Sequence, residues 1–322
     1  MRRLCLSSLV LALALLSACA RPLPPPAQPP PTPPAGEAEA VSLLGRPLVA
    51  PELPAELRRQ REAQLAEARA AAEARPDDPD ALIWLGRRTA YLGRYREAIG
   101  IFTRGVTRFP QDARFLRHRG HRHLSLRRFD LAEGDLEAAA RLVFGRPDEV
   151  EPDGLPNAAG IPTSTLQSNI WYHLGLARYL QGDFAAALPA YRAGLEVAKN
   201  PDMQVATRQW LYLTLRRLGR DAEAAEVLAP VHADMEILEN QAYHRLLLLA
   251  RGEVSAADLL AAKASSDLDP ASLGYGVGAW YLVQGQREEA LRTFLQVVET
   301  GPWSAFGVIA AEAELHRLGE GK

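Results

Sequence analysis

One spacing recurs three times along this 322-residue chain. It places a second glycine seven positions after the first, an alanine at twelve positions and an aromatic residue at sixteen. The copies are Gly86, Gly93, Ala98 and Phe102; Gly175, Gly182, Ala187 and Tyr191; and Gly278, Gly285, Ala290 and Phe294. Self-similarity of this kind predicts helical hairpins that stack on one another and usually present a binding surface.

The residue types within each copy have a physical reason. Gly86 and Ala98 are small, as expected where two helices cross closely, and Phe102 fills the space beside them. Gly93 is the residue that ends the first helix of the pair. We therefore expect repeats 1–2 over residues 79–144 and repeats 3–6 over residues 168–303.

Three of these six repeats are weaker. The second keeps Gly120 and Ala132 but has Arg127 where the turn glycine belongs. The fourth has Tyr212 at the position of the small residue, and the fifth, around Gly252, is degenerate. The pattern still predicts a helical pair at each of these places.

The best copy, with Trp84, Leu85, Gly86 and Pro110, resembles the tetratricopeptide repeat, a helix–turn–helix unit of about 34 residues. The resemblance implies an all-α, right-handed α-solenoid whose concave groove holds a peptide or helix of a protein partner. Carrying its register over places eleven residues in that groove: Arg87, Tyr91, Arg114, Arg117, His121, Asn169, Tyr172, Tyr179, Gln209, Arg216 and Arg217.

This set is basic, aromatic and amide-bearing, which suits a carboxylate. A guanidinium offers paired donors in a planar fork. One hypothesis is therefore an acidic peptide or a C-terminal carboxylate in the groove. The alternative is that these are solvated arginines on exposed helix faces.

A long segment from residue 145 to 167 interrupts the array between repeats 2 and 3. It is rich in proline and carries four acids: Asp148, Glu149, Glu151 and Asp153. A connection of this length in a compact array is usually functional or disordered. We expect either a lid loop whose acids fold over nearby arginines or a solvated surface loop.

Two flanking helices are expected to cap the stack, within residues 52–78 and 304–322. Terminal units of a solenoid need a polar outer face. Candidate residues for those faces are Arg58, Arg59, Arg61, Glu62 and Glu67 at one end and Glu312, Glu314, His316 and Arg317 at the other.

The N-terminus carries a processing signal, in which Arg2 and Arg3 precede an apolar run shorter than the about 20 residues of a membrane-spanning helix. The following Leu16-Ser17-Ala18-Cys19 resembles the lipobox of bacterial lipoproteins. This resemblance implies a signal peptide over 1–18, a diacylglycerol and an acyl chain on Cys19, and a cell-envelope location, facing the periplasm from the outer membrane. A proline-rich, disordered tether is expected over 19–51, and its residues 21–34 would span roughly 40 Å as polyproline.

Composition narrows the function further. Cys5 and Cys19 are the only cysteines, so the folded part has no thiolate for catalysis or zinc. A net charge of −2 gives no case for nucleic acid. His118 and His121 share a helix face among arginines, which disfavours a metal, and no cofactor is expected. We expect a non-catalytic scaffold or adaptor that supports an envelope complex. An envelope glycan-processing enzyme and a glycan- or small-molecule-binding solenoid stay open as alternatives.

Overall fold

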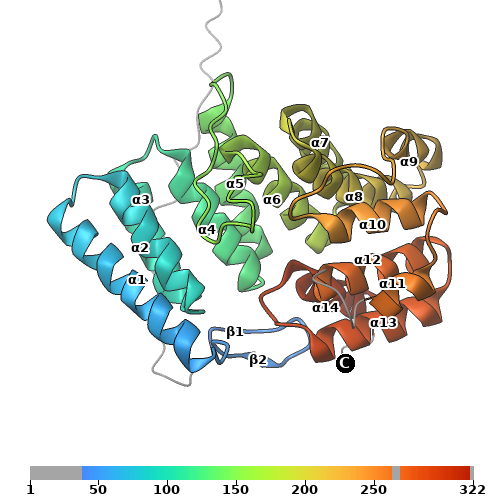
Figure 1. The fold of residues 1–322 in the computed structure, drawn as a ribbon, viewed down its shortest axis with the longest axis horizontal. Helices are drawn as coiled ribbons and strands as arrows, with labels where there is room; N and C mark the ends of the chain where they lie inside the picture. Colours follow the sequence, from blue (N-terminus) through green and yellow to red (C-terminus); the bar gives the residue numbers. More distant parts are fainter. Residues whose placement is uncertain (1–37, 263–268, 320–322) are drawn as a thin grey trace, which may run out of the picture.

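The computed structural model describes residues 38–262 and 269–319 (Figure 1). The signal peptide, Cys19 and the tether up to residue 37 lie outside the described residues. The elements are β1 Ala40–Val41, β2 Pro47–Leu48, α1 Ala55–Ala74, α2 Pro79–Tyr91, α3 Tyr95–Arg108, α4 Ala113–Ser125, α5 Phe129–Val143, α6 Leu166–Gln181, α7 Phe184–Val197, α8 Pro201–Arg217, α9 Asp221–Leu228, α10 Gln241–Ala250, α11 Ala256–Ala262, α12 Pro270–Val283, α13 Arg287–Thr300 and α14 Phe306–Leu318.

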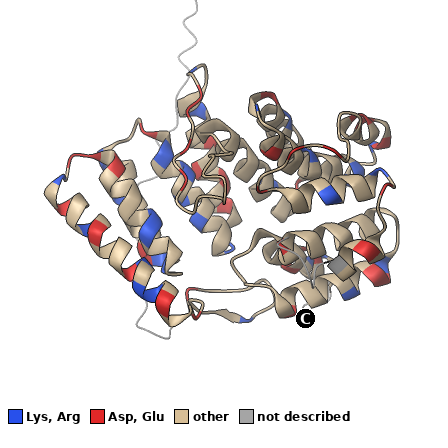
Figure 2. Cartoon of the chain, viewed as in Figure 1, with Lys and Arg blue, Asp and Glu red and all other residues tan. Residues whose placement is uncertain are grey.

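Six consecutive helix pairs follow α1 and form the expected all-α solenoid, which is confirmed. The pairs are α2–α3, α4–α5, α6–α7, α8–α9, α10–α11 and α12–α13, and each packs directly on its neighbours in the chain. Figure 1 shows the pairs following one another along a curved path. On α1, basic and acidic residues are interspersed (Figure 2), and among its twenty residues only Leu65 and Ala68 are buried.

The glycines of the three strong copies lie where two helices touch. A Cβ on Gly175 would lie 2.5 Å from the ring of Tyr191, and one on Gly278 would lie 2.6 Å from the ring of Phe294. Gly86 faces Phe102 in the same way. These contacts confirm the close crossing that the spacing predicts.

The turn of the second repeat has an unusual backbone. The turn glycines of the other repeats have positive φ, as Gly93 does at 77°. Arg127 takes the same left-handed conformation, at φ 60°, and is the one non-glycine residue to do so in the described part of the chain. Left-handed backbone is costly for a residue with a Cβ, so the side chain must be needed where it lies.

The C-terminal helix α14 does not cap the stack with a polar face. It turns inward and packs against α12, α13 and α6. Glu312 and Glu314 are 2% and 0% exposed, among apolar residues that are also buried. The prediction of a polar outer face was wrong for Glu312 and Glu314, because Glu312 pairs with the buried Arg127 and Glu314 pairs with the partly buried Arg217.

The segment that contains the β1–β2 hairpin links the first repeat to the residues just before α14 (Figure 1). The Arg96 amide donates to the Glu39 carboxylate at 2.8 Å, and the Trp303 indole donates to the Val49 carbonyl at 2.6 Å. The predicted disordered tether was therefore too long. Residues 38–51 are held between the start of α3 and the segment that leads into α14.

Candidate functional site

The eleven predicted groove residues do not form one open surface. Asn169, Tyr172, Tyr179 and Gln209 are all buried by more than nine-tenths. The Tyr179 hydroxyl lies 3.1 Å from that of Tyr275, so this ring belongs to the packing between α6 and α12. The prediction that these four side chains line an accessible groove was wrong, because other parts of the chain cover them. The Tyr172 hydroxyl contacts Tyr243 of α10, and the Asn169 side chain contacts Glu151 of the segment before α6.

Helix α14 occupies the inner face of the middle repeats. Arg127 and Glu312 form a buried pair with an N–O distance of 2.5 Å, and each side chain is at most 3% exposed. Arg217, a predicted groove residue, pairs with Glu314 at 2.7 Å. The ring of His121 lies 5.0 Å from that of Phe306 at the start of α14. A helix of the same chain therefore neutralises two arginines of the inner face.

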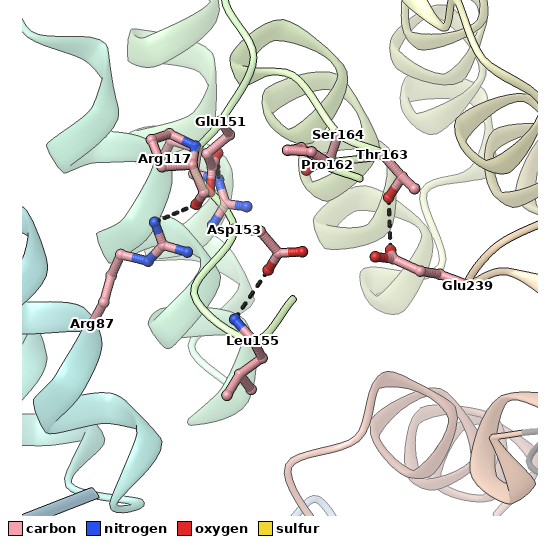
Figure 3. Close-up of a pocket in the computed structure, with 10 residues that line it drawn as sticks. Arg87, Arg117, Glu151, Asp153, Leu155, Pro162, Thr163, Ser164 and Glu239 are labelled. Carbon is pink, nitrogen blue, oxygen red and sulfur yellow. Dashed lines mark hydrogen bonds and ion pairs between the residues drawn. The ribbon is translucent and has the colours of Figure 1, made fainter. Parts of the chain in front are cut away.

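The segment between α5 and α6 covers the inner face of the first two repeats (Figure 3). The Glu151 carboxylate lies 2.9 Å from the Arg117 guanidinium and accepts a hydrogen bond from the Asn169 amide at 3.0 Å. Both partners of the Arg117–Glu151 pair are about nine-tenths buried. The pKa of Arg117 is lowered by burial, an effect that the charge of Glu151 opposes.

The same segment also gives its backbone to α2. Arg87 donates to the Pro152 carbonyl at 2.8 Å, and Arg88 donates to the Gly154 carbonyl at 3.3 Å. A Cβ on the buried Gly154 would meet the ends of the Tyr91 and Arg87 side chains. Arg87, Tyr91 and Arg117 are thus brought together around residues 151–154.

The other acids of the loop make different contacts. Asp148 accepts from the Thr165 hydroxyl at 2.6 Å and from the Gln167 amide at 3.0 Å, at the first turn of α6. That position favours a carboxylate because the first amides of a helix have no partner within it. Asp153 accepts from the Leu155 amide, and the side chain of Glu149 is exposed. Of the four acids, Glu151 is the one that pairs with an inner-face arginine.

The loop is an ordered structure tied to the later repeats. Its two arms pair, since the Glu151 amide donates to the Ser164 carbonyl and the Leu166 amide to the Glu149 carbonyl. Glu239 accepts from Thr163 and from Asn157, each at 2.6 Å. Glu239 is itself placed by its amide, which donates to the buried Asp202 at 2.7 Å.

A pocket of about 210 Å³ lies beside this segment. It is lined by Arg87, Arg117, Glu151, Pro152, Asp153, Leu155, Pro162, Thr163, Ser164 and Glu239 (Figure 3). Leu155 is 59% exposed, so one wall of the pocket is apolar and open to solvent.

Cations outnumber the carboxylates that they contact on this inner face. Arg87 and Arg88 donate to carbonyls there, and Arg122 lies 5.0 Å over the ring of Tyr95. No carboxylate of residues 38–262 or 269–319 pairs with Arg122. The pKa of Arg122 is lowered by burial and by the nearby charges of Arg117 and Arg87. We refer to Arg87, Arg88, Arg117, Arg122 and Tyr91 as the α2–α4 surface.

Two predicted groove residues lie elsewhere. Arg114 pairs with Asp80 at 2.5 Å and with Asp112 at 2.6 Å, and so links α2 to the start of α4. Arg216 pairs with Asp221 at 2.8 Å and donates to the Val283 carbonyl at 2.9 Å. Their donors are already used to join neighbouring helices.

A cluster of histidines lies behind the α2–α4 surface. The rings of His121 and His173 are 4.6 Å apart, and that of His118 stacks on Phe102 at 5.4 Å. Burial, followed by repulsion from nearby arginines, lowers the pKa of each of these three histidines well below the usual value. They are neutral at physiological pH. Within the described residues, no three histidine or acidic side chains converge in a way that could hold a metal ion.

Sequence reasoning missed Arg88, Arg122, Glu239 and the Arg127–Glu312 pair. Arg127 had a visible signal, because a large charged residue at a turn-glycine position is unusual. The Ala-rich run from Val308 to Ala313, with no clear polar face, was the corresponding signal in α14. The role of Glu239 depends on contacts 76 and 82 residues away along the chain, which no local pattern reveals.

Comparisons with known proteins found similarity to solved structures. No protein-family model matches the chain, and no curated protein matches it. Among solved structures, it is similar to a tetratricopeptide repeat protein from Parabacteroides merdae, with 17% identity, a TM-score of 0.48, and coverage of 81% of this chain and 94% of that one. Pseudomonas aeruginosa PilF shows 17% identity and a TM-score of 0.45, covering 77% of this chain and 87% of that one. YrrB, a TPR protein with an unusual peptide-binding site, shows 15% identity and a TM-score of 0.41, covering 75% of this chain and 95% of its own.

Fold and site together define a helical-repeat solenoid whose inner face is occupied by two segments of its own chain. One is the loop around Glu151, and the other is α14 with Glu312 and Glu314. No helix in the described part of the chain is long and apolar enough to cross a bilayer.

Proposed function

We propose that this protein is a non-catalytic scaffold that binds an extended, acidic segment of a protein partner on the α2–α4 surface. The observation that carries the proposal is the Arg117–Glu151 contact together with the donation from Arg87 and Arg88 to loop carbonyls. Guanidinium groups of this kind recognise carboxylates and extended backbone. The excess of arginines over contacting carboxylates favours an acidic ligand over a neutral one.

The remaining inner face is not proposed as a binding surface. Helix α14 contributes Val308, Ile309, Ala310 and Ala311 at no more than 1% exposure, so it is part of the core. A partner that displaced this helix would have to uncover all of that apolar area, at about 25 cal/mol per Å². The loop leaves its large apolar side chains exposed, Val150 at 63%, Leu155 at 59% and Ile161 at 54%, so it is the segment that a partner could replace.

The proposed location is the bacterial cell envelope. In this proposal, a lipid on Cys19 anchors the protein to the outer membrane, facing the periplasm, and the proline-rich tether holds the α2–α4 surface away from the lipid head groups. The Leu-Ser-Ala-Cys sequence before the tether supports this anchor. Two or more acyl chains are enough for stable attachment, at about 0.8 kcal/mol per buried CH₂.

The anchor is tested by cell fractionation and mass spectrometry. The wild type should partition with membranes, and its first residue should be a lipidated Cys19. The variant Cys19→Ala should be found in the soluble fraction. A wild type that carries no lipid would contradict the anchor and would leave the binding surface untouched.

Partner binding is tested by photo-crosslinking in cells from a probe at Tyr91. A crosslinked partner should be captured by the wild-type sequence and lost in Arg87→Glu, which reverses one charge of the α2–α4 surface. Arg141→Glu is the matched control, since the Arg141 side chain is 65% exposed on α5, away from this surface. Equal capture by Arg87→Glu and by the wild type would refute the proposed surface.

A further inference from the structure

Residues 151–154 occupy the α2–α4 surface as a ligand would, and they show what a partner must carry. Building on the proposed function, we propose that the partner segment has a glutamate followed three residues later by a glycine. In this proposal, Glu151 to Gly154 of the loop is a tethered copy of that segment, and the partner replaces it.

The first determinant is the carboxylate. Glu151 is 10% exposed, and its Oε2 atom contacts both Arg117 and Asn169. Its Oε1 atom lies 3.9 Å from the ring of the buried His118. A glutamine here would leave Arg117 buried without a countercharge, which is far costlier than losing a solvated contact.

The second determinant is a pair of backbone carbonyls, in a stretch that forms no helix or strand and bends at Gly154. Arg87 and Arg88 donate to carbonyls two residues apart, those of Pro152 and Gly154, and the Glu151 amide pairs with Ser164. These contacts involve no side chain of residues 152 and 153. Pro152 is exposed, and Asp153 bonds within the loop, so the surface tolerates other residues at both positions.

The third determinant is the glycine. Gly154 is buried against the ends of Tyr91 and Arg87, and a Cβ would push both side chains away from the segment that they contact. Because these are the ends of side chains, an alanine should weaken binding less than loss of the carboxylate. Beside Gly154, the pocket next to Leu155 leaves room for residues that flank the partner's glycine.

The tethered copy should suppress binding of a free peptide. A short tether gives an effective concentration on the order of millimolar, so a free segment of equal affinity competes poorly. A partner must therefore either bind more tightly or act when the loop is displaced. A free peptide should therefore bind measurably only to variants in which the loop is altered.

The probe is a fluorescein-labelled peptide of residues 147–158, measured by fluorescence anisotropy. The receptor is the full chain with residues 150–155 replaced by glycine and serine at unchanged length. This receptor should bind the peptide at least about ten-fold more tightly than the wild type does. A peptide with Glu151→Gln should lose at least about ten-fold in affinity, and one with Gly154→Ala about three-fold or more. A peptide with Asp153→Asn is the control and should lose much less affinity than the Glu151→Gln peptide, because the hydrogen bond of Asp153 is made within the loop.

Circular dichroism checks that the replaced-loop protein keeps its helices. If it does not, the full chain with Glu151→Gln gives a second route, since it keeps the loop and loses only the carboxylate. It too should bind the native peptide more tightly than the wild type does. Equal affinity for the native, Glu151→Gln and Gly154→Ala peptides, or no binding to a folded receptor, would overturn the proposal.

Sedimentation of the Glu151→Gln variant separates a partner from a second copy of this chain. We expect a monomer, and a dimer that exchanges loops would overturn the proposal in favour of self-association. The outcomes also separate the two levels of inference. If the peptide binds as expected but no partner is crosslinked in cells, the scaffold function alone is refuted. If a partner is crosslinked in an Arg87-dependent way but the peptide of residues 147–158 does not bind as expected, only the proposed motif is refuted.

Discussion

The buried pair of Arg127 and Glu312 should be the most sensitive point of the fold. It joins the turn of the second repeat to α14, 185 residues later. Arg127 also donates to the carbonyls of Ser125, at 2.6 Å, and Trp303, at 2.9 Å, and Glu312 also accepts from the Leu43 amide. Four separate segments therefore depend on two side chains.

The expected magnitudes follow from burial. Removing one partner of a buried pair leaves an uncompensated charge and costs about 3–5 kcal/mol, so Glu312→Ala should lower the free energy of unfolding by that amount. Arg127→Gly leaves Glu312 unpaired but relieves the left-handed backbone, which is worth about 1–2 kcal/mol. Its net cost should be about 1–4 kcal/mol.

The double variant separates the pair from its surroundings. Arg127→Gly with Glu312→Ala removes both charges, so the double variant should cost less than the sum of the two single variants. The coupling energy from the double-mutant cycle should therefore be at least about 3 kcal/mol. Urea unfolding followed by circular dichroism at pH 7 measures all four proteins.

An exposed ion pair supplies the control. Glu289 and Arg292 are 43% and 70% exposed on α13, so Glu289→Ala should change the free energy of unfolding by less than about 1 kcal/mol. A stabilising effect of Arg127→Gly, or a cost of Glu312→Ala no larger than that of Glu289→Ala, would refute the buried pair.

Two further predictions concern acid and packing. Burial lowers the pKa of a histidine in the folded protein, to about 3 for His123, below its value in the unfolded chain. The contribution of such a histidine to stability is therefore complete when the pH is above the unfolded-state pKa. It is lost progressively as the pH falls below the unfolded-state pKa. Each histidine that stays neutral at pH 5 should cost about 2 kcal/mol relative to pH 7. Urea unfolding at both pH values should show a smaller loss for His123→Gln than for the wild type, and an equal loss in the two proteins would contradict the neutral buried histidine. The buried His118, His121 and His173 should likewise lower the stability of the folded protein as the pH falls. Gly175→Ala should destabilise the protein by about 1–3 kcal/mol, because its Cβ would meet the Tyr191 ring. The control Gly134→Ala, whose Cβ meets open space on α5, should be neutral or stabilising. Equal thermal unfolding midpoints for the two variants would contradict the close crossing of the helices.

The helical repeats could be predicted because their determinants are local. Gly175 and Tyr191 are sixteen residues apart, and their contact is made within one hairpin. Gly93 likewise ends α2 in a left-handed backbone conformation, at φ 77°, which is a local feature of the turn. Such features repeat with the period of the array, so the sequence displays them several times.

Closure of the array could not be predicted in the same way. Glu312 reads as a polar cap residue in the sequence, and its burial depends on Arg127, which lies in another repeat. Tyr179 was assigned to an open groove for the same reason, since nothing near it in sequence shows that Tyr275 will cover it. A regular repeat pattern specifies each hairpin but leaves open whether the chain later folds back on its own inner face.

The partial success at the acidic segment has a similar cause. The acids and the arginines were recognised as complementary, but which acid would pair depends on loop geometry. Asp148 turns to the start of α6, and Glu151 alone reaches Arg117. The carbonyl contacts of Arg87 and Arg88 involve backbone, which has no signature in the sequence.

Hydrogen exchange of the loop most directly tests whether the chain occupies its own binding surface. The amides of Glu151 and Leu166 donate to loop carbonyls and should be protected in the wild type. In Arg117→Gln, which removes the charge that holds Glu151, exchange over residues 149–155 should be at least about ten-fold faster, while α12 and α13 stay unchanged. Exchange of residues 149–155 at the rate of an unfolded chain in the wild type would contradict the occupied surface, as would equal protection in both proteins.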